Sequence, residues 1–386
     1  MPRRINWIGL ALAVIGTAAC GRSEPQKRAG ETSAPAANVA GTSPAALLQL
    51  ARGQATYDKF CVQCHGVDLK GYVADNAPSL VSPTFLASAD ADFLRAAIEI
   101  GRPDTAMGAY ASARGGPLGP ADVNALIRLI LSRRTGDRAT LSPPAPGNAQ
   151  RGQTVYDATC RKCHGDATTR VSAVSIVNPA FLASASDDFL TFAIRKGRPG
   201  TPMEGFGTTL SDEQIGDVVR YLRAQQPAAP ATASGNSDIG VAALTPESDA
   251  KMPVILNPKG RAPTFTLRED RFVSVDQVKA ALDGKRRLVL VDARPASEWS
   301  AERVAGAISI PYYQLDGVSR LPTDGTWVVA YCGCPHHLSG MVVDELLGRG
   351  FKHAAVLDEG IAVWKQRGYP VAGQLARASR VVSRGR

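Results

Sequence analysis

The chain has 386 residues, of which 44% are hydrophobic, and its formal net charge is +9. This length allows two or three ordinary domains, and the hydrophobic content excludes a chain that is disordered throughout. The basic residues are spread along the sequence without a stripe or a reader motif, so we expect no nucleic-acid partner.

The N-terminus has the features of an export signal. Two arginines precede an apolar run from Ile8 to Ala19, and the small residues at its end lead into Cys20. The run is shorter than the ~20 residues that a helix needs to cross a bilayer. We therefore predict a signal peptide over residues 1–20 and a protein that is exported to the periplasmic side of a bacterial membrane.

The residues before Cys20 resemble the lipobox of bacterial lipoproteins, although Thr17 stands where that family usually has leucine. The resemblance implies that Cys20 is acylated and that its lipid anchors the chain to a membrane. The alternative is a plain cleaved signal in which this cysteine has no role. Residues 21–43 are rich in Ala, Pro, Ser and Gly, a composition that predicts a flexible tether.

Residues 44–134 and 147–224 are two versions of one sequence. Each has a helical pattern, a Cys-x-x-Cys-His motif, the segment Phe-Leu-Ala-Ser and a second helical pattern. A loop that begins Gly-Arg-Pro and contains a methionine then leads to a closing amphipathic helix. In the second version this last helix starts with a capping box, Ser211 to Gln214. The pattern predicts two all-helical domains of the same build.

The two Cys-x-x-Cys-His motifs carry the most specific chemistry in the sequence. They comprise Cys61, Cys64 and His65 in the first version and Cys160, Cys163 and His164 in the second. This spacing places two thiols where they can add to the vinyl groups of one haem, with the histidine under the iron. A zinc finger built from both cysteine pairs would need them much closer in sequence. We therefore predict two covalently bound haem c groups.

A methionine in each version is the candidate for the other axial iron ligand. Met107 and Met203 occupy the same position in the Gly-Arg-Pro loops, and the chain has only five methionines. Ligation by histidine and methionine leaves no open iron site and favours electron transfer over oxygen chemistry. The alternatives are that these methionines only fill the core, or that a five-coordinate haem binds a small gas.

Both versions resemble class I cytochrome c domains. The resemblance implies a few helices around each haem, with the first and last helices crossing. It matches Gly53 with Tyr57, and Gly152 with Tyr156, to the close-packed pair on the family's first helix. It also implies haem attachment at the four motif cysteines and axial ligation by His65, His164, Met107 and Met203.

The pattern changes after the second version. Residues 225–262 are rich in Ala, Pro, Ser and Gly, which predicts a linker. Beyond it, apolar runs at 288–291 and 327–330 have the length of buried strands and alternate with helical patterns at 275–282 and 339–347. This alternation predicts an α/β domain with a central parallel sheet.

Residues 272–373 resemble a single rhodanese domain in segments that include Leu290 to Arg294 and Tyr331-Cys332. The resemblance implies a rhodanese-like domain over 263–373 with Cys332 as its nucleophile and Asp292 and Arg294 as framework residues. Members of that family include sulfurtransferases, arsenate reductases and related phosphatases, so the fold does not fix the reaction. The basic residues 374–386 are expected to be a disordered tail.

The loop after the strand at 327–330 carries the candidate reactive groups. Cys332 ends the strand and faces the start of a helix, where backbone N–H groups stabilise a thiolate. The loop has no Arg or Lys to bind an oxyanion, but it contains Cys334, His336 and His337. We predict a Cys332 persulfide that carries sulfur from a small sulfur compound, with Cys334 as a resolving thiol and the histidines as proton carriers.

Three hypotheses for this domain remain open: sulfur transfer, an inactive docking domain, and a copper or zinc site built from the two cysteines and two histidines of the loop. Sulfur transfer, combined with the haem domains, predicts that electrons leave a sulfur compound through the haems to a periplasmic redox partner or terminal oxidase. The docking hypothesis predicts a dihaem electron carrier whose third domain only binds a partner.

Overall fold

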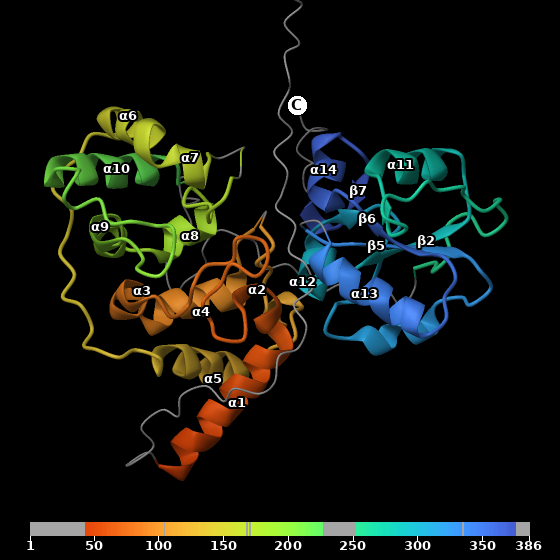
Figure 1. Ribbon diagram of the computed structural model, residues 1–386, viewed down its shortest axis with the longest axis horizontal. Coiled ribbons are helices and arrows are strands. Elements are labelled where there is room, and N and C mark those ends of the chain that lie inside the picture. The colour runs from red at the N-terminus through yellow and green to blue at the C-terminus, as the bar shows by residue number, and fades with distance from the viewer. Residues whose placement is uncertain are drawn as a thin grey trace, which may run out of the picture. The chain divides into compact units, whose positions relative to one another are not determined.

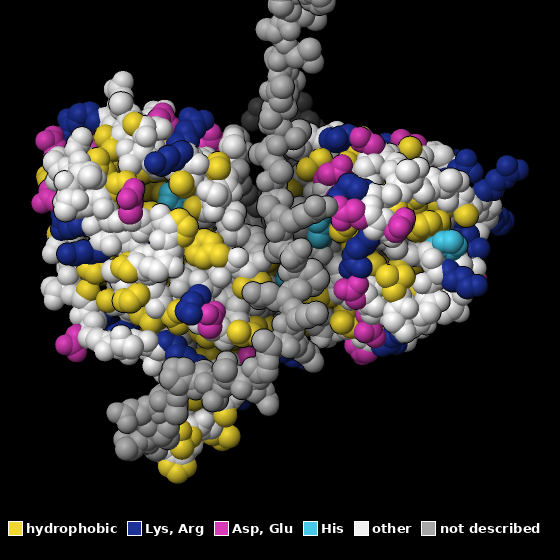
Figure 2. Space-filling model, viewed as in Figure 1, with side chains coloured by type: hydrophobic (Ala, Val, Ile, Leu, Met, Phe, Trp, Pro, Cys, Tyr) yellow, Lys and Arg dark blue, Asp and Glu magenta, His cyan; other side chains and the backbone are white. Residues whose placement is uncertain are grey.

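The computed structural model describes residues 43–103, 105–166, 169, 171–226, 252–333 and 336–375. The predicted signal with Cys20, nearly all of the tether, Cys334 and the tail from residue 376 lie outside the described residues. Within the described ranges, no helix is both long and apolar enough to cross a membrane. On the face drawn in Figure 2, basic and acidic side chains are interspersed over the described residues.

The first repeat folds into short helices, coloured red to ochre in Figure 1. They are α1 (Pro44–Phe60), α2 (Val62–His65), α3 (Pro83–Ser88), α4 (Ala91–Ile100), the 3-10 turn η1 (Ser112–Arg114) and α5 (Pro120–Leu131). Side chains cap the N-termini of two of these helices. Ser43 accepts a hydrogen bond from the Ala46 N–H at 3.3 Å, and Asp90 accepts one from the Phe93 N–H at 2.8 Å.

The second repeat follows the same plan. Its helices are α6 (Ala149–Thr159), α7 (Arg161–His164), α8 (Pro179–Ser184), α9 (Asp187–Lys196) and α10 (Asp212–Ala224). The predicted capping box is confirmed, because the Gln214 N–H donates to Ser211 Oγ at 3.2 Å and the Ser211 N–H donates to Gln214 Oε1 at 2.9 Å. The prediction of two all-helical repeats is therefore correct.

Helices α3 and α8 were not predicted, although the sequence carries a signal for them. Each begins with a proline, Pro83 or Pro179, at its first position, where the missing N–H costs nothing. Each also ends within the Phe-Leu-Ala-Ser segment that the two repeats share. Neither helix has more than six residues, so its hydrophobic periodicity is too short to detect.

The first and last helices of each repeat pack closely, as the cytochrome resemblance implies. A Cβ atom added at Gly53 would lie 2.4 Å from Ala125 O, and one at Gly152 would lie 1.9 Å from Asp217 O. Glycine is therefore the residue that lets α1 meet α5 and α6 meet α10 at this distance. The neighbouring tyrosines of α1 and α6 are fully buried.

The C-terminal domain is an α/β domain with a parallel sheet, as predicted. The sheet has the strand order β1 (Phe272–Val273), β6 (Ala354–Leu357), β5 (Trp327–Tyr331), β2 (Leu288–Asp292) and β4 (Ile308–Ser309). The helical segments are α11 (Val275–Asp283), α12 (Ala296–Ala301), η2 (Leu315–Arg320), α13 (His337–Gly348) and α14 (Gly360–Gln366). A separate antiparallel pair joins β3 (Arg303–Val304) and β7 (Val371–Ala372).

Both faces of this sheet are buried, which explains the continuous apolar runs in its strands. Along β5, Val328 and Ala330 pack in one core cluster with residues of α13. Val329 and Tyr331 pack in the other cluster, with residues of α11 and α14. The alternation along one strand therefore fills two cores.

Part of the predicted linker packs against this domain. Met252, Val254 and Ile255 lie against the core cluster on the α13 face. The Leu256 N–H donates to Leu288 O at 2.8 Å, which joins this segment to the first residue of β2. The packing of the domain therefore begins before residue 263, where we placed its start.

We expect Gly53→Ala to lower the free energy of unfolding by about 1–3 kcal/mol, the usual cost of overpacking a core. The added carbon would meet backbone atoms of α5, so the two helices must move apart to accept it. Gly136→Ala is the matched control, because nothing lies within 4 Å of its added carbon. Chemical unfolding of the purified holoprotein measures both variants, and equal stabilities would contradict the packing argument.

Candidate functional site

The two motif histidines are buried at the ends of the one-turn helices α2 and α7. His65 Nδ1 lies 2.9 Å from Pro78 O, and His164 Nδ1 lies 2.8 Å from Val174 O. A carbonyl accepts a hydrogen bond only from a protonated Nδ1, so Nε2 of each ring is left free to bind a metal. Burial lowers the pKa of both imidazoles and keeps them in the neutral form that an iron ligand requires.

The motif cysteines are free thiols. In both repeats the histidine N–H donates to the carbonyl of the first cysteine at 3.0 Å, which closes the turn that carries both sulfurs. Burial raises the pKa of Cys61 and Cys64 to about 12 and that of Cys160 to about 11.

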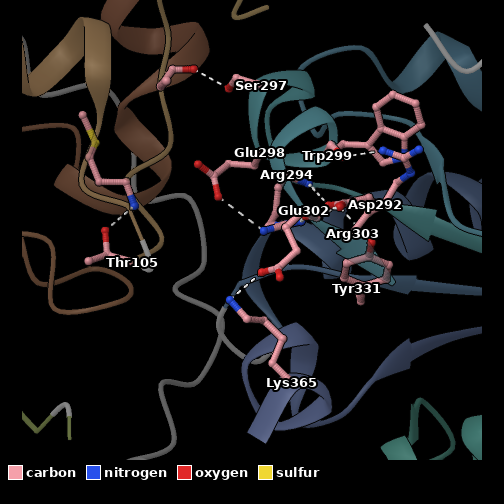
Figure 3. A network of polar contacts seen from close by, with 12 residues as sticks. Thr105, Asp292, Arg294, Ser297, Glu298, Trp299, Glu302, Arg303, Tyr331 and Lys365 are labelled. Carbon is pink, nitrogen blue, oxygen red and sulfur yellow. Dashed lines mark hydrogen bonds and ion pairs between the residues drawn. The ribbon is translucent and has the colours of Figure 1, made fainter. Parts of the chain in front are cut away.

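The two methionine loops have the same internal hydrogen bonds. The arginine N–H donates to the methionine O at 2.6 Å in the first loop and 2.7 Å in the second. The threonine hydroxyl accepts a bond from the methionine N–H at 3.0 and 3.1 Å. Figure 3 draws this last bond at Thr105. The residues are Arg102, Thr105 and Met107 in the first loop and Arg198, Thr201 and Met203 in the second.

Both methionines are half-buried, and Met107 packs against the core cluster that the two repeats share. Each loop starts at a glycine with a positive φ, 73° at Gly101 and 63° at Gly197. A Cβ atom there would come within 2.4 Å of the backbone that follows the methionine. Two thiols, one neutral imidazole and one thioether in each repeat are the donor set that haem c needs.

Cys332 lies directly after β5 at the start of α13, as predicted. Its Sγ is 3.3 Å from Ser339 Oγ, and the residue is 3% exposed. Burial raises the pKa of Cys332, whereas hydrogen bonds from the Ser339 hydroxyl and from the N–H groups of Ser339 and Leu338 lower it. These donors form a cradle for a negative sulfur at the helix start.

The two histidines of the loop have different surroundings. His336 adopts a positive φ of 86° before α13, and its Nε2 lies 2.7 Å from Asp358 Oδ1. Arg268 binds the same carboxylate at 2.8 and 2.9 Å. His337 Nε2 is buried and has no hydrogen-bond partner among the described residues.

No group of three or more His, Cys, Asp or Glu side chains in the described part of the chain could hold a bare metal ion. Cys334 lies outside that part, so the hypothesis of a metal site with two cysteines and two histidines stays a hypothesis.

A buried ion-pair network supports the cysteine loop (Figure 3). Arg294 donates to the Asp292 carboxylate at 2.7 and 3.0 Å, and Tyr331 donates to the same carboxylate at 2.8 Å. A Cβ atom added at Gly333 would lie 3.9 Å from Arg294 Cδ. These bonds join the carboxyl ends of β2 and β5, the strand that leads into the cysteine loop, so Asp292 and Arg294 act as framework residues.

The first repeat contacts the C-terminal domain beside its haem motif. The hydroxyl groups of Tyr110 and Tyr312 are 3.0 Å apart, and Tyr312 also donates to the carbonyl of Phe60 at 2.5 Å. Phe60 directly precedes the first motif cysteine. Ser297 donates to Ala109 O at 2.5 Å, a bond drawn in Figure 3.

The cysteine loop itself contacts the first methionine loop. A Cβ atom at Gly333 would lie 3.7 Å from Ala106 Cα. Gly333 follows Cys332 and Ala106 precedes Met107. Burial is the main cause of the raised pKa of Cys64, and the charge of Cys332 also raises it. The candidate thiol and the first haem motif are therefore neighbours.

Sequence analysis did not single out Ser339, Tyr110 or Tyr312. A hydroxyl in the first turn after the nucleophile is a local signal that could have identified Ser339. The two tyrosines are 202 residues apart, and no sequence pattern connects them.

Three family profiles match parts of the chain. The Cytochrome c profile matches residues 50–134, and the profile of subunit III of cbb3-type cytochrome c oxidase matches residues 147–222. The Rhodanese-like domain profile matches residues 274–367. Cytochrome c domains imply covalently bound haem c and electron transfer.

Similar proteins are known for the haem region. Cytochrome c6 of Rippkaea orientalis is 34% identical over 98 residues, which are 23% of this chain and 81% of that protein. The CcoP subunit of a cbb3-type cytochrome c oxidase from Azospirillum brasilense is 26% identical over 190 residues, 45% of this chain. The chain spans 61% of the length of that subunit.

Solved structures match both regions at low similarity. The rhodanese-like domain of an Anabaena protein is 25% identical, with a TM-score of 0.25, and the match covers 27% of this chain and 79% of that one. A reducing HAO-like protein complex of Kuenenia stuttgartiensis is 18% identical, with a TM-score of 0.32, over 45% of this chain and 96% of that one.

We expect Ser339→Ala to slow alkylation of Cys332 at neutral pH by about tenfold, because a hydrogen bond to a charged group contributes about 1.5–3 kcal/mol. The serine bond lowers the pKa of Cys332, so its loss moves the alkylation profile to higher pH. Iodoacetamide rates from pH 6 to 10, followed by peptide mass spectrometry, measure the shift. Ser319→Ala, at an exposed serine of the same domain, is the control. Identical profiles would show that the hydroxyl does not stabilise the thiolate.

Proposed function

Because the chain belongs to the cytochrome c family, we propose that it is a dihaem electron-transfer protein with a rhodanese-like domain that oxidises a sulfur compound at Cys332. Haem c supplies a one-electron acceptor and donor at its iron. The first repeat would hold one haem through Cys61, Cys64, His65 and Met107, and the second another through Cys160, Cys163, His164 and Met203. The closeness of Gly333 to Ala106 supports electron transfer from Cys332 to the first haem site, because it places the thiol loop beside the first methionine loop.

The chemistry at Cys332 decides which sulfur compound can provide electrons. The Cys332 thiolate and a hydrosulfide ion combine to a persulfide, with release of one proton and two electrons. A sulfur–sulfur bond forms and the S–H bond of hydrosulfide breaks. Transfer of sulfur from thiosulfate would instead release sulfite and no electrons. Hydrosulfide is therefore the proposed donor, and its two electrons match the two proposed haem sites.

Neighbouring groups of this loop support the step. Ser339 and the helix N–H groups stabilise the Cys332 thiolate, the form that is oxidised together with hydrosulfide. We assign the released proton to His336, whose Nε2 lies 2.7 Å from Asp358 Oδ1 beside the cysteine loop. Cys334 remains the proposed resolving thiol, which would take the sulfur from the persulfide.

One observation favours the alternative of a pure electron carrier with a docking domain. Cys332 is only 3% exposed, and a buried thiol is less accessible to a substrate than the thiol of an open active site. In that case the rhodanese-like domain would bind a partner and its cysteine would only fill the loop.

We also infer that the chain is exported and held at a membrane through Cys20. The signal-like N-terminus supports this, and haem attachment of this kind takes place after export. The similarity to a cbb3-type oxidase subunit supports a terminal oxidase or another redox protein outside the cytoplasm as electron acceptor.

We expect the wild-type chain to sediment with membranes and Cys20→Ser to appear in the soluble fraction, because the substitution removes the acylated residue. Thr17→Leu is the control, since it restores the residue common in lipoboxes and keeps the cysteine. Fractionation with detergent extraction measures the distribution. A Cys20→Ser protein that stays with the membranes would refute the lipid anchor.

Under anaerobic conditions we expect hydrosulfide to reduce the oxidised holoprotein, with two haems reduced for each hydrosulfide consumed. Cys332→Ser should lower the rate to that of direct haem reduction by free hydrosulfide, because no persulfide can form without the Cys332 sulfur. Visible spectroscopy of the reduced haem band measures the rate. Ser319→Ala should match the wild type, and thiosulfate should reduce neither protein. Equal rates in wild type and Cys332→Ser would favour the pure electron carrier.

A further inference from the structure

Four phenylalanines at matching positions of the two repeats form one aromatic cluster. Phe93 and Phe189 stack with ring centroids 4.7 Å apart and an angle of 29° between the rings. Phe85 and Phe181 each meet Phe93 edge-on, at 6.2 and 6.1 Å. In Figure 1 the helices that carry them, α3 and α4 of the first repeat and α8 and α9 of the second, lie side by side. Like positions therefore meet like positions, as in a two-fold symmetric dimer.

One arginine from each repeat lies over this phenylalanine cluster. The guanidinium of Arg102 is 5.5 Å from the Phe93 ring and 5.7 Å from the Phe181 ring. Arg198 lies over the other two rings, at 5.1 and 5.7 Å. Each arginine thus contacts one ring of its own repeat and one of the other, with cation–π geometry.

The two arginines also form polar contacts across the interface. Arg102 Nη2 lies 3.3 Å from Ser184 Oγ of the second repeat. Arg198 Nη1 lies 3.4 Å from Thr84 Oγ1 of the first repeat. The two partners, Ser184 and Thr84, do not occupy matching positions, but each arginine side chain contacts the other repeat, so the pair belongs to the interface rather than to either repeat alone.

Further bonds across the interface end on the methionine loops. The Thr84 hydroxyl donates to Gly197 O at 2.6 Å, at the start of the second loop. Asn178 Nδ2 donates to Pro103 O at 2.7 Å, in the first loop. Within each loop, the backbone N–H of the same arginine donates to the methionine carbonyl. Each loop is therefore fixed partly by the other repeat.

The arginines bring positive charge into this buried interface. Burial lowers the pKa of Arg102 and of Arg198 to about 10, so both remain cationic at neutral pH. Neither forms an ion pair with a carboxylate among the described residues. Oxidation adds a positive charge at an iron, so a buried cation nearby favours the reduced form and raises the reduction potential.

We propose that Arg102 and Arg198 are positioning residues of one shared unit, which holds both methionine loops and sets the reduction potentials of both haem sites together. The proposal rests on the proposed binding of a haem by each repeat. It makes the two sites a coupled pair, in which a change in one repeat alters the potential of the other.

Redox titration of Arg102→Gln holoprotein tests this coupling. We expect the midpoint potentials of both sites to fall, although the substitution lies in the first repeat only. A Met107→His background removes methionine ligation from the first site, so the methionine–iron band then follows the second site alone. Arg102→Lys, which keeps the charge, should give a smaller shift. Arg128→Gln, at an exposed position of α5, is the control and should shift neither site.

The outcomes separate this proposal from the function on which it depends. A wild-type protein with fewer than two haems would contradict the dihaem function. Two haems with a shift confined to the first site would overturn the coupling alone. If Arg102→Gln does not bind haem, Thr84→Val is the second variant, because it removes the two hydroxyl contacts of Thr84 with the second repeat, to Gly197 O and to Arg198 Nη1. It should weaken the methionine–iron band of the second site, and an unchanged band would overturn the coupling.

Discussion

The hydrogen bond from each motif histidine to a backbone carbonyl is the constraint on which the haem sites depend. At 2.9 and 2.8 Å, the carbonyls of Pro78 and Val174 fix the tautomer and orientation of the two rings. Because Nδ1 is held by this bond, Nε2 is the nitrogen left to bind iron, and the orientation of the ring sets the direction of its lone pair. The cysteine turn, the close helix contact at Gly53 or Gly152 and the self-bonded methionine loop then complete a donor set around each fixed imidazole.

The repeats share one buried core, so the second histidine site is not an independent copy of the first. Their aromatic side chains belong to a single hydrophobic cluster, whereas the rhodanese-like domain has clusters of its own on the two faces of its sheet. Burial of two arginines that have no carboxylate partner in the described ranges opposes the stability of this interface. Because burying these two arginines lowers stability, their presence is better explained by an effect on the reduction potentials of the haem sites than by a stabilising role.

Sequence analysis identified the features whose signals are local. The two Cys-x-x-Cys-His turns, the capping box at Ser211 and the apolar strands at 288–291 and 327–330 each depend on residues close together in the chain. The contacts between domains have no such signal, because nothing in the sequence shows which surfaces meet. The stacking of Phe93 on Phe189 and the bond between Tyr110 and Tyr312 are of this kind. The pairing of Leu256 with Leu288 was not predicted, because a single β-bridge involves too few residues to produce a periodic pattern in the sequence.

The order of contacts gives a direction to the proposed electron path. The thiol loop of the rhodanese-like domain contacts the first methionine loop, and the first repeat in turn shares its core with the second. The first repeat therefore lies between the sulfur chemistry and the second repeat in the sequence of contacts. Oxidation of hydrosulfide releases two electrons, whereas each haem site accepts one, so rapid exchange between the repeats would clear the first site for the second electron. This requirement would give a physical reason for two fused cytochrome c domains with a common core, and in the proposed path the second repeat is the side from which electrons leave the protein.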